Sequence, residues 1–123
     1  MLVTLLALLC GSLFPLSGVG NARAAELQRF AITIKNRKVE PAQKLIRVTR
    51  GDALELEFST DEAAELHLHG YDKLIKVAPS APAVLRLDAT IAGRFSIEAH
   101  GFASHTSGQR RNIVLLYLEV HPR

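Results

Sequence analysis

The sequence is poor in sulfur and has no tryptophan. Of its 123 residues, one is cysteine, Cys10, and one is methionine, Met1. A single cysteine excludes an internal disulfide, and the chain beyond residue 10 has no thiolate for catalysis or for a metal. No Ser-His-Asp order with a nucleophile elbow is present either. We therefore expect a protein that is not an enzyme.

Clusters of one charge are also lacking. Fifteen Lys and Arg against twelve Asp and Glu give a net charge of +3. The basic residues are scattered, and the longest basic runs are the pairs Arg37-Lys38 and Arg110-Arg111. A nucleic-acid-binding face would gather basic side chains with interleaved aromatic ones. The sequence therefore predicts no nucleic-acid partner.

The first 24 residues have the pattern of a secretory signal. Residues 2–9 are almost wholly apolar, and Ala22-Arg23-Ala24 offers a small-x-small cleavage site. We expect residues 1–24 to be a signal peptide and the protein to be periplasmic or secreted. The alternative is an uncleaved anchor, although glycines and Pro15 interrupt the ~20 apolar residues that a spanning helix needs. After cleavage no stable membrane span is expected.

Beyond this leader, apolar and polar residues alternate with a period of two, which predicts half-buried strands. The expected strands cover residues 30–34, 46–48, 54–58, 66–68, 74–77, 83–87, 95–99 and 113–120. The last is apolar on both faces and is expected to lie inside a sheet. Short strands at this regular spacing are typical of an antiparallel β-sandwich.

Four segments, taken in order, resemble a cupredoxin-like domain. They are VTRGDALELEF at 48–58, HLHGYD at 67–72, AGRFSIEAH at 92–100 and LEV at 118–120. The order is similar to that of the family: a strand after a Gly-Asp turn, a His-bearing strand, a Gly-x-aromatic strand leading to the metal loop, and a closing strand. The resemblance implies an all-β Greek-key sandwich of seven or eight strands over residues 26–123.

The resemblance also implies ligands that this chain does not have. Blue-copper sites use two His, one Cys thiolate and a weak axial ligand, which is usually Met. Ala99 or His100 stands about where the family carries its Cys, and no Met follows in residues 101–111. We therefore do not expect a blue-copper electron carrier.

Imidazoles remain as candidate ligands. His67 and His69 lie two apart on a predicted strand, so both point to the same side, with Cβ atoms ~6–7 Å apart. The resemblance places His100 on a neighbouring strand and His105 in the loop of later ligands, which gathers the donors at one rim. Glu98 is a candidate fourth ligand or an acceptor for an imidazole. Three imidazoles and a water suit copper or zinc.

Two functions stay open. The first is an exported cupredoxin-like protein that binds copper, or another divalent metal such as zinc, through His67, His69 and His100. The second is a metal-free accessory or partner-binding module in the periplasm, in which His67 and His69 face water because Leu66 and Leu68 face the core. The expected partners are accordingly a metal ion or an exported protein. Residues 70–72 are predicted to form a turn.

Overall fold

The computed structural model describes residues 25–102 and 112–123. The predicted signal peptide, residues 1–24, and the predicted loop ligand His105 lie outside the described residues. Within the described ranges the elements are β1 (Leu27–Ile34), η1 (Pro41–Gln43), β2 (Leu45–Thr49), β3 (Ala53–Thr60), β4 (Ala64–Leu68), β5 (Lys73–Val77), β6 (Ala83–Asp88), β7 (Gly93–His100) and β8 (Ile113–His121). No helix in these ranges is long and apolar enough to cross a membrane. The predicted all-β class is confirmed.

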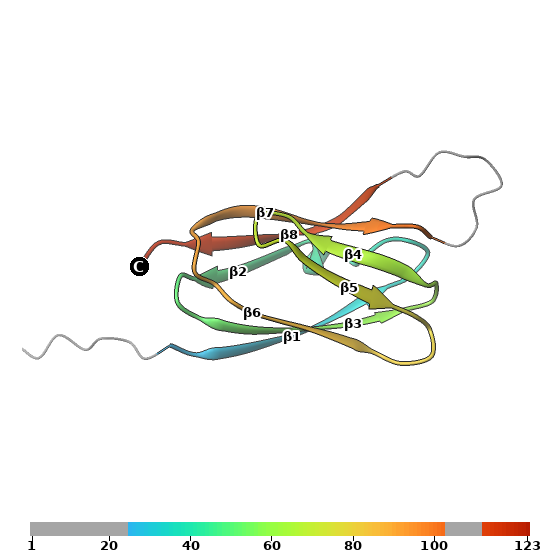
Figure 1. Cartoon of the computed structure of the whole chain (residues 1–123), viewed down its shortest axis with the longest axis horizontal. Helices are drawn as coiled ribbons and strands as arrows, with labels where there is room; N and C mark the ends of the chain where they lie inside the picture. The colour runs from blue at the N-terminus through green and yellow to red at the C-terminus, as the bar shows by residue number, and fades with distance from the viewer. Residues whose placement is uncertain (1–24, 103–111) are drawn as a thin grey trace, which may run out of the picture.

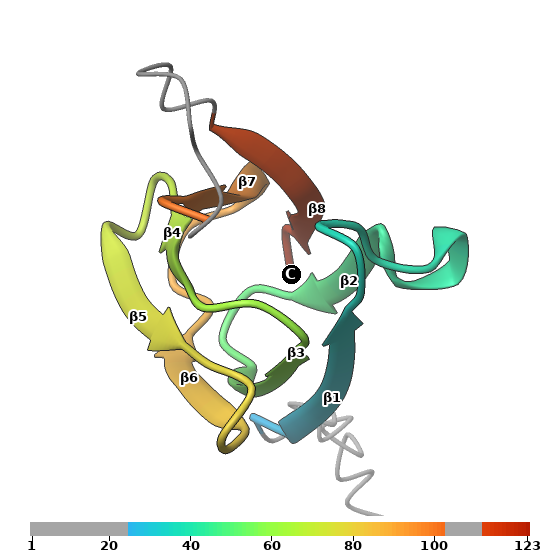
Figure 2. The same ribbon diagram turned by 90° about the vertical axis from the view of Figure 1, so that its right-hand side faces the viewer.

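The strands form two sheets that enclose one core. The smaller sheet has the order β1-β3-β6, and the larger has the order β2-β8-β7-β4-β5. Figure 2, seen along the strands, shows the two sheets facing each other around a shared interior. Every strand contributes at least one buried apolar side chain, among them Ile32, Ile46, Phe58, Leu66, Val77, Leu85, Ile97 and Leu118. The β-sandwich predicted from the period-two pattern is confirmed.

Each sheet mixes parallel and antiparallel pairs, whereas the sequence predicts antiparallel pairs alone. β1 runs parallel to β3, and β2 runs parallel to β8. The alternation of apolar residues is the same for either direction, so the sequence pattern cannot distinguish them. The strand expected inside a sheet is β8, and it does lie between β2 and β7 (Figure 1).

The two faces of β4 are strictly divided. Leu66 and Leu68 are 1% and 0% exposed, while His67 between them is only partly buried and lies on the outer face. A slip of one residue in register would exchange the two faces. It would remove two buried leucines from the core, at a cost of about 1.5–3 kcal/mol each. The core therefore fixes which side chains the outer face of β4 presents.

The turn after β4 is fastened to the loop before β7. The Tyr71 hydroxyl donates to the carbonyl of Ile91 at 2.8 Å and accepts from the Ile91 N–H at 3.0 Å. The Tyr71 ring also meets Phe95 edge-on, with ring centroids 4.9 Å apart. Gly70 has a φ of +84°, and a Cβ there would lie 2.3 Å from Phe95 Cδ1. The predicted turn is therefore present, and its shape requires glycine beside the Phe95 ring.

The substitution Gly70→Ala should destabilise the fold for two reasons. An L-residue in a left-handed conformation costs about 1–2 kcal/mol, and overpacking against Phe95 costs about 1–3 kcal/mol more. We expect the free energy of unfolding in urea to fall by about 2–5 kcal/mol. Gly101→Ala is the matched control, because Gly101 has a φ of +69° but, apart from its chain neighbours, no atom of the described residues lies within 4 Å of its Cβ position. Equal losses for the two variants would contradict the role of the Phe95 contact.

Candidate metal centre

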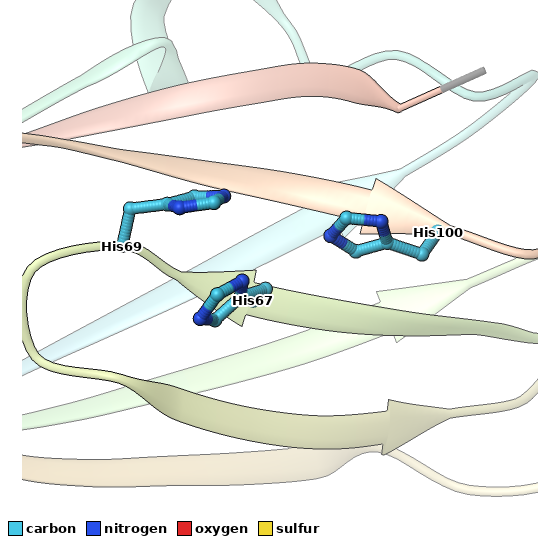
Figure 3. Close-up of side chains that lie close together, drawn as sticks. All are labelled: His67, His69 and His100. Carbon is cyan, nitrogen blue, oxygen red and sulfur yellow. The ribbon is translucent and has the colours of Figure 1, made fainter.

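Three imidazoles from two adjacent strands meet on one surface. His67 lies on β4, His69 in the turn that follows, and His100 is the last residue of β7 (Figure 3). One ligand nitrogen from each ring lies within 4.8 Å of the other two. The ring centroids of His67 and His69 are 4.0 Å apart, and those of His67 and His100 are 6.0 Å apart. The structure thus brings together the three histidines singled out from the sequence.

This cluster lies on the outer face of the five-stranded sheet rather than at a rim. β4 pairs antiparallel with β7, with His67 opposite Glu98 and Glu65 opposite His100. The outward residues of both strands therefore share one face. The register between β7 and β8 shifts at Ile97/Glu98, where Ile97 pairs with Leu116 and Glu98 with Val114, so the extra residue is Leu115 of β8. The alternation along β7 continues through this point, which keeps Glu98 and His100 on the same face.

Two of the imidazoles are hydrogen-bonded to an oxygen, and the third lies near one. Nε2 of His67 lies 3.0 Å from Oδ1 of Asp72, and Nδ1 of His100 lies 2.8 Å from Oδ1 of Asn112. Nε2 of His69 lies 3.2 Å from Oε2 of Glu98, although the direction is not that of a hydrogen bond. Oxygen acceptors of this kind orient the imidazoles of metal sites.

These contacts decide which nitrogens remain available. Oxygens of a carboxylate or an amide only accept, so Nδ1 of neutral His100 and Nε2 of neutral His67 carry the protons. The lone pairs then lie on Nε2 of His100 and Nδ1 of His67. Among the described side chains, Nε2 of His69 and Nε2 of His100 are buried nitrogens with no hydrogen-bond partner. Leaving such an atom unsatisfied costs about 1–3 kcal/mol.

The spacing of the nitrogens is close to that of a filled site. Two nitrogens bound to one ion at ~2.0–2.1 Å can lie at most ~4.2 Å apart. The observed limit of 4.8 Å is slightly wider. Small rotations about the side-chain torsions close this difference, because the rings are only partly buried. The three imidazoles could therefore hold one metal ion.

A groove of about 830 Å³ reaches the cluster from the β5 side. Its lining includes His67, His100 and Asn112, together with the apolar side chains of Leu74 and Val77. His69 and Glu98 do not line it. The site is therefore open to solvent on the side of His67 and His100, which gives a hydrated ion a path to the cluster.

Two contact residues of the cluster were not identified from the sequence. Asp72 was assigned only to a turn, but that turn folds back and places its carboxylate beside His67. Asn112 begins the segment leading into β8 and is 12 residues from His100 in the chain. The signal that could have found Asp72 is the tight Gly70 turn, which returns the chain alongside β4. Nothing in the sequence pattern indicates the pairing of Asn112 with His100.

Sequence comparisons find no relative of this chain, whereas comparison with solved structures finds similar folds. No protein-family model matches the sequence, and no curated protein matches it. A chain of a heme-copper terminal oxidase dimer superposes with a TM-score of 0.59 at 13% identity, covering 76% of this chain and 65% of its own. A copper-binding protein in its apo form gives 0.56 at 11% identity, covering 77% and 88%.

A third similar structure contains subunit II of a cytochrome c oxidase in a mixed disulfide with a thioredoxin-like protein. The TM-score is 0.52 at 14% identity, with 76% of this chain and 81% of the other covered. The chain thus spans slightly less than two thirds of the first of these structures, at 65%. At such low identities the likeness establishes the fold alone. The fold is cupredoxin-like, as the resemblance of the four sequence segments implied.

The substitution Tyr71→Phe should loosen the turn that carries His69 and Asp72. It removes the hydroxyl that bridges both backbone groups of Ile91. We expect the Ile91 amide to lose its protection from hydrogen exchange, and the free energy of unfolding to fall by about 1–2 kcal/mol. Tyr117→Phe is the control, since the Tyr117 hydroxyl makes no hydrogen bond within residues 25–102 and 112–123. An Ile91 amide that stays protected would contradict this account.

Proposed function

We propose that the protein binds a divalent metal ion, copper(II) by preference, through His67, His69 and His100. The observation that carries the proposal is the pair of buried, unpartnered Nε2 atoms of His69 and His100 in a group of three imidazoles. An ion at their common point would satisfy both atoms. Imidazole suits copper and zinc alike, and a given nitrogen site holds copper(II) more tightly than zinc.

The role that fits such a site is storage, delivery or sensing of copper rather than catalysis or electron transfer. Three imidazoles leave a coordination position for water, and the groove beside His67 and His100 makes that side accessible. The thiolate of a blue-copper centre is lacking, since the sequence has no cysteine after Cys10. The signal-like pattern of residues 1–24 supports a periplasmic or secreted location. The copper-binding function named for one similar structure supports the choice of metal.

One observation favours the second candidate, a metal-free module that binds an exported protein. Leu74 is 60% exposed and Val114 is 45% exposed. They are the strand partners of His67 and Glu98, so they flank the histidine cluster on the same face. Exposed apolar side chains beside polar ones are found at protein interfaces. A similar structure caught with a thioredoxin-like protein is consistent with this candidate.

Metal titration separates the two candidates. The purified protein, stripped with a chelator, is titrated with copper(II) or zinc(II) while its melting temperature is followed. An ion that binds only the folded state adds about 2.7 kcal/mol at a hundredfold excess over Kd. We expect a rise in melting temperature with both ions, and a larger rise with copper(II).

The controls use the histidines of this chain. The double variant His67→Ala/His69→Ala should lose the shift, whereas His121→Ala should keep it, because His121 lies outside the cluster and contacts Glu119. A melting temperature that does not move at a hundredfold excess over a micromolar Kd would leave the metal-free module as the function. A shift that survives the double variant would show that the metal binds elsewhere and would overturn this site.

A further inference from the structure

We infer that Asp72 and Glu98 set the valence of the bound metal, so that the site holds copper(II) and discriminates against copper(I). This inference rests on the proposed function and deepens it. It concerns two carboxylates that contact the imidazoles and the charge that they place around the ion. Neither residue is needed to complete the group of three nitrogen donors.

The Glu98 carboxylate is held firmly beside the cluster. Its side chain is 18% exposed, and its Oε1 accepts a hydrogen bond from the Ser96 hydroxyl at 3.2 Å. Its Oε2 lies 3.2 Å from Nε2 of His69, and its backbone is paired opposite His67. The charge is thus fixed next to the point where the ion would lie, with little water to screen it.

The Asp72 carboxylate is also negatively charged, but it is much more exposed to solvent than that of Glu98. Its Oδ1 lies 3.0 Å from Nε2 of His67, yet its side chain is 95% exposed. Water and salt therefore screen its charge strongly. We expect Asp72 to act in the same direction as Glu98 with a smaller effect.

The charges around the site match a divalent ion. Three neutral imidazoles contribute none, and the two carboxylates contribute −2, which balances copper(II) or zinc(II). With copper(I) the same group would carry a net charge of −1. Among residues 25–102 and 112–123, Glu65 and Lys76 also lie near the cluster, and because they are opposite charges paired across β4 and β5 they add no net charge. The third oxygen partner, Asn112, is neutral.

The donor set points in the same direction. Copper(I) prefers the sulfur of Cys and Met, while imidazole and carboxylate suit divalent ions. No Cys or Met occurs in the part of the chain that the structure describes. Charge and donor type therefore both favour the divalent state.

The test is the ratio of copper(II) to copper(I) affinity. Copper(II) affinity is measured by competition with an amino-acid chelator in air, and copper(I) affinity by competition with bathocuproine disulfonate without oxygen. In Glu98→Gln we expect the ratio to fall about tenfold, which corresponds to a rise of about 59 mV in the one-electron potential. In Asp72→Asn we expect a fall of about twofold to threefold.

Glu119→Gln is the matched control. It removes the same charge from the same sheet, but Glu119 is paired with Arg94, four residues or ~13 Å along β7 from Glu98. In Glu119→Gln the ratio of copper(II) to copper(I) affinity should stay within about twofold of the ratio for the unaltered protein. Zinc(II) affinity gives a second measurement, since it should fall with copper(II) affinity and not follow copper(I). The melting temperature of each metal-free variant shows that the fold is kept.

The outcomes are distinguishable. If the unaltered protein binds no copper in either state, the proposed function fails and this inference with it. If the protein binds copper but Glu98→Gln and Asp72→Asn leave the ratio where Glu119→Gln leaves it, the metal site stands and only the valence inference is overturned.

Discussion

The residues that β4 presents on its outer face are determined by the burial of two leucines. Leu66 and Leu68 are held in the core between the sheets, so the residues that alternate with them must face outward. That constraint turns His67 to the surface, and the turn that follows keeps His69 close to it. Because β4 is hydrogen-bonded to β7, the same surface includes Glu98 and His100. An arrangement of nitrogen donors thus follows from apolar packing on the opposite side of the sheet.

The strands bring the histidines close together, and residues of the connecting segments orient the imidazole rings. The turn after β4 carries Asp72 to His67, and the segment before β8 carries Asn112 to His100. Tyr71 fixes that turn by bonding to Ile91, which precedes β7. Two of the rings are therefore oriented by groups from two separate connections before any ion is bound. Such preorganisation reduces the entropy that must be lost on binding.

Much of this arrangement could be predicted from the sequence, and the rest could not for identifiable reasons. Period-two alternation predicts six of the eight strands and the inner and outer faces of β4, because burial enforces it, whereas β5 and β8 are predicted from short apolar runs. Alternation has no direction, so it could not show that β1 runs parallel to β3 and β2 parallel to β8. His67, His69 and His100 were found because residue type and spacing are visible in the sequence. The partners Asp72 and Asn112 were not, because their contacts depend on how turns bring the chain back.

The close approach of Phe95 to Gly70 links two positions that are 25 residues apart in the chain. A smaller residue at 95 would remove the clash but not the left-handed φ of +84°, which disfavours any side chain at position 70. A library that randomises residues 67–72 should therefore keep glycine at position 70. The path of the turn is thus tied to the start of β7 through one residue that has no side chain.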